Sequence, residues 1–131
     1  MTGKQRGFTL LEIMVVLVII GVLAAIVAPR FMDRADEAKV EATRAQMESI
    51  AQALKLYRLQ QNHYPSSSEG LNALVQGVNG KRYMDKVPKD AWDNDFVYLA
   101  PGVHGDFDIL SYGADGKAGG EGFDADLGNW E

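Results

Sequence analysis

A segment rich in glycine and aspartate near the C-terminus, Asp115–Asp126, holds the side chains best suited to bind an ion. Its crowded carboxylates repel one another unless a cation or hydrogen-bond donors neutralise them. Ca²⁺ takes about six to eight oxygens from carboxylates and carbonyls, and glycines let backbone carbonyls turn inward. The segment lacks histidine and cysteine, which disfavours zinc. It therefore predicts a Ca²⁺ site, with a solvated acidic loop as the alternative.

Known calcium motifs match this segment only in part. Gly119–Asp124 fits one turn of the Gly-Gly-x-Gly-x-Asp calcium β-roll, which requires tandem copies. Asp124-Ala125-Asp126 lacks the remainder of an EF-hand loop. The ligands therefore have to be inferred from more than a local motif.

A second chemical feature is Glu12, which lies inside an apolar run from Phe8 to Ala28. As a helix this run spans about 30 Å, the thickness of a hydrocarbon core. A carboxylate at the bilayer centre costs about 3 kcal/mol, and less near the interface, unless it is paired. The basic leader with Lys4 and Arg6 should stay cytoplasmic, which would put the residues after Arg30 across the membrane.

A conventional cleaved signal peptide is the alternative interpretation of the apolar run. Leu23-Ala24-Ala25 could serve as a weak cleavage site. Two features oppose it: the acidic Glu12, and the helical pattern that continues beyond Pro29.

The stretch from Arg6 to Glu12, Arg-Gly-Phe-Thr-Leu-Leu-Glu, resembles the prepilin processing site of type IV pilins and type II secretion pseudopilins. The resemblance implies that a prepilin peptidase cuts between Gly7 and Phe8 and methylates the new amine of Phe8. That amine could pair with Glu12 of a neighbouring subunit and set the register of a polymer. The alternative is that Glu12 only complements the positive end of its own helix.

Gly21 and Pro29 should soften the first helix. Proline in a helix interior costs about 3 kcal/mol and glycine about 1 kcal/mol. The resemblance implies that the stretch from Gly21 to Pro29 loses helicity on assembly. A simple kink tolerated in a membrane is the alternative.

From Arg30 to about Leu59 the sequence predicts one amphipathic helix. Its first half mixes alanines with charges of both signs, typical of a solvated stalk or an intersubunit surface. Its second half carries an apolar stripe that should cover a core. The stripe consists of Met47, Ile50, Leu54 and Tyr57.

The remainder of the chain predicts a short helix and a small sheet. Ser66 and Glu69 have capping-box spacing for a helix through about Gln76, which Gly77 would stop. Residues 96–99 and 107–111 flank a Pro-Gly turn and predict a β-hairpin, with a third strand near 82–87. The expected fold class is α+β. We expect a leader at 1–7, an anchor and assembly helix at 8–29 and a periplasmic domain at 30–131.

The second half resembles the major pseudopilin of type II secretion systems more than a generic pilin. Tyr64-Pro65 followed by Glu69-Gly70-Leu71 matches its segment after the long helix, and Asp90-Ala91-Trp92-Asp93-Asn94 matches its Asp-Pro-Trp-Gly-Asn turn. Ala91 and Asp93 depart from Pro and Gly, although aspartate tolerates the left-handed conformation that glycine would adopt.

The resemblance also implies a ligand set and partners. The metal ligands would be the side chains of Asp115, Asp124 and Asp126, with carbonyls around Leu110 and Ser111. The chain would polymerise into a pseudopilus in the bacterial inner membrane and periplasm, with a prepilin peptidase, an inner-membrane assembly platform and minor pseudopilins as partners. The alternatives are a type IV pilin, whose frequent cysteine pair is absent here, and a periplasmic binding module with an ordinary signal peptide.

Other function classes receive little support from the sequence. A net charge of −5 and the lack of a basic stripe argue against nucleic-acid binding. His63 and His104 are isolated in the sequence and read as surface residues, while Trp92 and Trp130 read as packing residues. No nucleophile elbow, phosphate loop or metal-binding histidine pair is present, so we expect no enzymatic activity.

Overall fold

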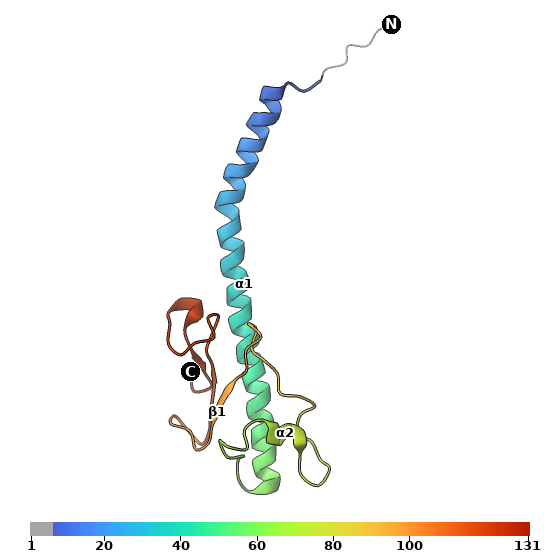
Figure 1. The fold of residues 1–131 in the computed structure, drawn as a ribbon, viewed down its shortest axis with the longest axis vertical. Coiled ribbons are helices and arrows are strands. Elements are labelled where there is room, and N and C mark those ends of the chain that lie inside the picture. Colours follow the sequence, from blue (N-terminus) through green and yellow to red (C-terminus); the bar gives the residue numbers. More distant parts are fainter. Residues whose placement is uncertain (1–6) are drawn as a thin grey trace. The chain divides into compact units, whose positions relative to one another are not determined.

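The computed structural model describes residues 7–131, and most of the predicted leader lies outside this range. A single helix, α1 (Leu10–Gln61), contains both Gly21 and Pro29 and continues through them (Figure 1). The chain divides between Ala35 and Asp36 into two compact units. Each unit is described separately below.

In the N-terminal unit, α1 begins two residues later than the predicted start at Phe8 because Thr9 caps it. The Thr9 hydroxyl accepts a hydrogen bond from the Glu12 amide at 3.1 Å, and the Thr9 carbonyl accepts one from Ile13 at 3.2 Å. Such a cap satisfies amides that have no partner within the helix. Among residues 7–131, only α1 is long and apolar enough to cross a membrane.

In the C-terminal unit, the distal half of α1 covers a small core, as its apolar stripe predicted. Met47, Ile50, Leu54 and Tyr57 are all buried. Asn62 ends the helix in the left-handed region with φ 65°, shortly before Pro65. The core is completed by buried apolar residues from α2, the strands and their flanks: Leu71, Leu74, Phe96, Tyr98, Phe107, Ile109 and Leu127.

The sheet has three antiparallel strands in the order β1-β2-β3 and lies beside the distal half of α1 (Figure 1). β1 (Val97–Leu99) and β2 (Asp108–Ser111) form the predicted hairpin, with Val97 opposite Leu110. β3 (Leu127–Gly128) pairs with the end of β2. This arrangement confirms the α+β fold class.

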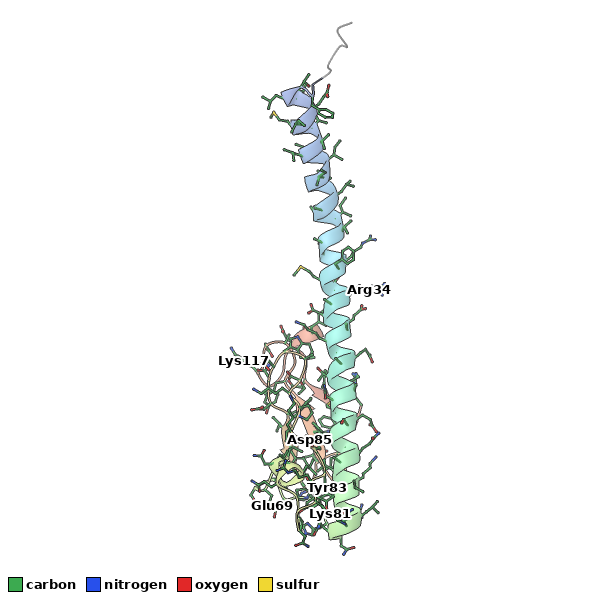
Figure 2. The ribbon with its side chains drawn as sticks, turned by 90° about the vertical axis from the view of Figure 1, so that its right-hand side faces the viewer. Arg34, Glu69, Lys81, Tyr83, Asp85 and Lys117 are labelled. Carbon is green, nitrogen blue, oxygen red and sulfur yellow. The ribbon has the colours of Figure 1, made fainter. Side chains whose placement is uncertain are left out.

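The predicted third strand near residues 82–87 is wrong, since β3 occupies that role. The backbone amides of Tyr83 and Met84 instead donate to the Leu74 carbonyl at 2.9 and 3.2 Å. The Tyr83 hydroxyl donates to Gln60 Oε1 at 2.9 Å, which holds this segment near the end of α1 (Figure 2). Its hydrogen bonds are therefore made to helices.

The predicted helix at 66–76 is shorter than expected, because α2 spans only Asn72–Gln76. The capping box does form: the Ser66 amide donates to Glu69 at 3.0 Å, and the Glu69 amide donates to Ser66 Oγ at 3.2 Å. Gly70, with φ 66°, then interrupts the turn before α2 begins. Gly77 ends α2 as predicted, with φ 69°.

Candidate functional site

The predicted processing site lies immediately before α1. Gly7, Phe8 and Thr9 have no helical assignment, and Phe8 is 83% exposed. No atom lies within 4 Å of the position that a Cβ on Gly7 would occupy. The peptide bond between Gly7 and Phe8 is therefore outside the helix and accessible, as a protease substrate must be.

Glu12 lies in the first turn of α1, where its backbone amide is bonded to Thr9. Within residues 7–131, its carboxylate has no hydrogen bond or ion pair. The capping role of Thr9 was not predicted from the sequence. The spacing Thr9-x-x-Glu12 is typical of a helix N-cap and could have identified it.

The predicted calcium loop is closed on itself by backbone and carboxylate hydrogen bonds. The Ala114 amide donates to the Phe123 carbonyl at 3.0 Å. Asp115 accepts a hydrogen bond from the Lys117 amide at 3.1 Å, and the Lys117 side chain projects outward from the loop (Figure 2). Asp126 Oδ2 accepts one from the Gly119 amide at 3.0 Å.

The other carboxylate oxygen of Asp126, Oδ1, is buried without a hydrogen-bond partner. It is the only buried side-chain N or O atom of this kind in the part of the chain that the structure describes. A buried unpaired acceptor is costly, and such groups usually mark a water or an ion. Asp126 therefore has unused capacity to bind a cation.

Backbone carbonyls crowd around the glycines of this loop. A Cβ on Gly113 would lie 2.7 Å from the Ala125 carbonyl oxygen, and one on Gly120 would lie 2.6 Å from that of Asp124. Both glycines have positive φ, 71° and 101°. Carbonyl oxygens and a carboxylate oxygen without a partner are the kinds of ligand that Ca²⁺ prefers.

The remaining predicted ligands are distributed around the loop. Among residues 7–131, no three acidic, histidine or cysteine side chains gather around one point, so Asp115, Asp124 and Asp126 do not converge. Asp124 lies in a short 3₁₀ helix, η1 (Gly122–Asp124). Leu110 and Ser111 end β2, opposite Gly128 and Leu127, and so lie next to the strand that leaves the loop.

His104 is exposed, as predicted from the sequence, but it contacts two residues that are distant from the expected turn or follow it in the chain. Its Nδ1 lies 3.1 Å from Asp108 Oδ2, and its ring stacks on Trp130 with centroids 3.8 Å apart. Asp108 also accepts hydrogen bonds from the amides of Val103 and His104. Burial alone would raise the pKa of Asp108, but these hydrogen bonds outweigh it and lower the pKa.

Comparisons with known proteins match both the C-terminal unit and the N-terminal motif of this chain. The family model described as type II secretion system, protein G, matches residues 30–130, and the prokaryotic N-terminal methylation motif matches residues 2–28. The type II secretion system core protein G of Pseudomonas aeruginosa is 49% identical, over 98% of this chain and 96% of that protein. The protein of the same name from Escherichia coli K12 is 43% identical, over 98% and 93%.

A solved structure gives the same result at the level of the fold. The crystal structure of the major pseudopilin from the type 2 secretion system of enterohaemorrhagic Escherichia coli matches with a TM-score of 0.65 and 33% identity. The match covers 76% of this chain and 92% of that chain.

Fold and N-terminal motif together define a membrane-anchored, pilin-like structural subunit. The chain belongs to the protein G family of the type II secretion system. These matches support the pseudopilin interpretation over the type IV pilin alternative. Members of this family are structural subunits that assemble with other components of the secretion system.

Proposed function

We propose that this chain is the major structural subunit of the type II secretion pseudopilus, a periplasmic filament that drives export of folded proteins across the outer membrane. The observation that carries the proposal is the family match together with an uncovered apolar helix. From Phe8 to Val27, every large apolar side chain of α1 and its N-terminal flank is exposed. In a membrane lipid covers this surface, and in a filament neighbouring helices would.

Processing would prepare the helix for assembly. A prepilin peptidase would cleave between Gly7 and Phe8 and methylate the new amine. That amine would pair with Glu12 of a neighbouring copy, because a carboxylate in an apolar bundle requires a partner. The inner-membrane platform and minor pseudopilins would assist assembly, and the basic leader would orient residues 30–131 toward the periplasm.

The substitution Glu12→Ala tests this function. We expect normal membrane insertion and a mature N-terminus at methylated Phe8, since neither requires the carboxylate. We also expect loss of sedimentable filaments and of secretion, because a buried amine without its partner costs about 3 kcal/mol or more per contact.

Glu48→Ala is the matched control, since Glu48 is an exposed acid on the same helix and its carboxylate accepts a hydrogen bond from the Gln52 side chain. This variant should assemble and secrete normally. Normal filaments from Glu12→Ala would overturn the pairing role. A mature chain that begins beyond Ala24 would overturn the polymer model as a whole.

We further propose that the C-terminal loop binds Ca²⁺. Support comes from the unpaired Asp126 Oδ1 and from the carbonyls that surround Gly113 and Gly120. Asp115 and Asp124 would contribute side chains, and the chain near Leu110 and Ser111 would contribute carbonyls. When bound, the ion would neutralise the acidic loop and hold its two ends together, a role that disulfides play in other small domains.

Thermal unfolding of the full chain in detergent micelles, in EGTA and in millimolar Ca²⁺, tests this second proposal. At a hundredfold excess over Kd, binding adds about 2.7 kcal/mol, enough to raise Tm by about 10 °C. Asp126→Asn should abolish the increase, whereas Asp106→Asn should retain it because Asp106 pairs with Arg58 outside the loop. An unchanged wild-type midpoint would contradict the proposal.

A further inference from the structure

Asp90 is a buried carboxylate, 5% exposed, that no predicted function uses. Its Oδ1 accepts hydrogen bonds from the amides of Trp92 and Asn94 at 3.0 and 2.9 Å. Its Oδ2 accepts one from the Ser111 hydroxyl at 2.7 Å. Three donors thus satisfy a charge that would otherwise be costly to bury.

Ser111 connects this carboxylate to Gly113, two residues before the proposed calcium loop. Its hydroxyl oxygen, which donates to Asp90, also accepts a hydrogen bond from the Gly113 amide at 3.3 Å. The turn also lies close to the loop at Gly116, where an added Cβ would be 3.3 Å from Asn94 Nδ2. Residues 90–94, the Asp90 turn, therefore hold the end of β2 through the hydrogen bond of Ser111 and lie close to the loop at Gly116.

The same turn is attached to α1. Thr43, which is fully buried, accepts a hydrogen bond on its hydroxyl from the Ala91 amide at 3.1 Å. Asp93 adopts φ 64°, the left-handed conformation that its type tolerates, so that the turn can close. The Asp90 turn consequently links helix α1 to the loop through side-chain hydrogen bonds within the C-terminal unit.

We propose that the Asp90 turn positions the Ca²⁺ loop: Asp90 acts through Ser111 to hold the start of the loop, and Thr43 anchors the turn on α1. This inference rests on the proposed Ca²⁺ site. Residues that orient ligands without touching the metal typically change metal affinity by about 10- to 100-fold when they are mutated. Asp90 and Thr43 are positioning residues of this kind.

Thermodynamic coupling then acts in both directions. If Thr43 helps to hold the loop ready for Ca²⁺, then Ca²⁺ must in turn stabilise the hydrogen bond between the Ala91 amide and Thr43. Ca²⁺ should therefore slow hydrogen exchange at the Ala91 amide. A merely structural role of Asp90 or Thr43 does not require this effect.

The test is a Ca²⁺ titration of the full chain in detergent micelles, measured by calorimetry. Hydrogen exchange of the Ala91 amide is measured with and without Ca²⁺. We expect Asp90→Asn and Thr43→Val to weaken Ca²⁺ binding about tenfold or more. Thr43→Ser keeps the hydroxyl and should restore wild-type affinity. Asp108→Asn is the matched control: Asp108 is equally buried, 4% exposed, but bonds to Val103 and His104.

Each outcome bears on the proposal. Weaker binding in Asp90→Asn and Thr43→Val, with wild-type affinity in Asp108→Asn and slower Ala91 exchange in Ca²⁺, supports it. Wild-type Ca²⁺ affinity in Asp90→Asn would overturn the positioning role of Asp90 but not the Ca²⁺ site. The same conclusion would follow if Asp90→Asn, Thr43→Val and Asp108→Asn all lost affinity in proportion to their loss of Tm. A wild-type chain that binds no Ca²⁺ overturns the site and the inference together.

Discussion

Asp90, Asp108 and Asp126 belong to the same C-terminal unit, but their carboxylates differ in the hydrogen-bond donors that surround them. Asp90 accepts hydrogen bonds from two amides and a hydroxyl, and Asp108 from two amides and His104. Asp126 accepts a single amide and retains one buried oxygen without a partner. The first two are therefore satisfied by the fold, whereas the third has bonding capacity for a ligand.

Asp108 should make stability depend on pH. Its pKa in the folded chain is lowered, so it lies below the unfolded value of about 3.9. Ionised Asp108 therefore adds stability above about pH 4, and this stability is lost as pH falls through the folded pKa. Urea unfolding at several pH values should show less acid destabilisation in Asp108→Asn than in the wild type.

The exposed Asp106, whose side chain is 70% accessible, provides the comparison. Asp106→Asn should follow the wild-type pH dependence, because an exposed ion pair contributes little. If Asp108→Asn lost stability at low pH as steeply as the wild type, the hydrogen bonds of this carboxylate would not be the cause.

At the scale of elements, α1 remains helical through Gly21 and Pro29 in the isolated chain. Proline nevertheless removes one backbone donor, and glycine lowers helix propensity. A helix can be continuous in its dominant conformation and still open locally at a low free energy. The two observations are therefore compatible. Whether this stretch loses helicity on assembly stays a prediction.

Pro29→Ala should therefore stiffen α1. In micelles, amides between Gly21 and Pro29 should exchange faster than those between Glu12 and Gly21 in the wild type. The substitution should slow them about tenfold or more, since about 3 kcal/mol of helix strain is removed. Gly21→Ala should have a smaller effect, consistent with about 1 kcal/mol. Uniform exchange along this part of α1 in the wild type would argue against a soft segment.

β3 illustrates how a short element can be stabilised by one side chain beyond its end. The strand has two residues, but Asn129 continues its pairing with β2. The Ile109 amide donates to Asn129 Oδ1 at 2.9 Å, and the Asn129 amide donates to the Ile109 carbonyl at 3.1 Å. Because β3 directly follows Asp126, this pairing also fixes the end of the acidic loop for which we propose Ca²⁺ binding.

At the scale of the whole chain, the two units differ in whether they bury their own apolar side chains. The N-terminal unit exposes its apolar side chains and requires lipid or neighbouring subunits to cover them. The C-terminal unit buries a small core of its own, to which α1 contributes one stripe. A domain of about this size is marginal without additional support, and the chain contains no cysteine. A bound ion in the loop would supply that support.

The sequence alone determined the features that depend on neighbours along the chain. The length of the apolar run, the motif from Gly7 to Glu12, the buried stripe of α1 and the hairpin of β1 and β2 all follow from local residue type and spacing. The acidic loop was also recognisable, because its charges and glycines are adjacent. Sequence spacing did not show, however, which of its carboxylate oxygens lacks a partner.

Only the tertiary structure decided the contacts between distant segments. The hydrogen bonds from Ala91 to Thr43 and from Ser111 to Asp90 join residues 48 and 21 positions apart. The pairing of β3 with β2 and the stacking of His104 on Trp130 are likewise nonlocal. Such pairs meet only when packing brings their segments together, and the local periodicity of neither segment specifies the other as its partner.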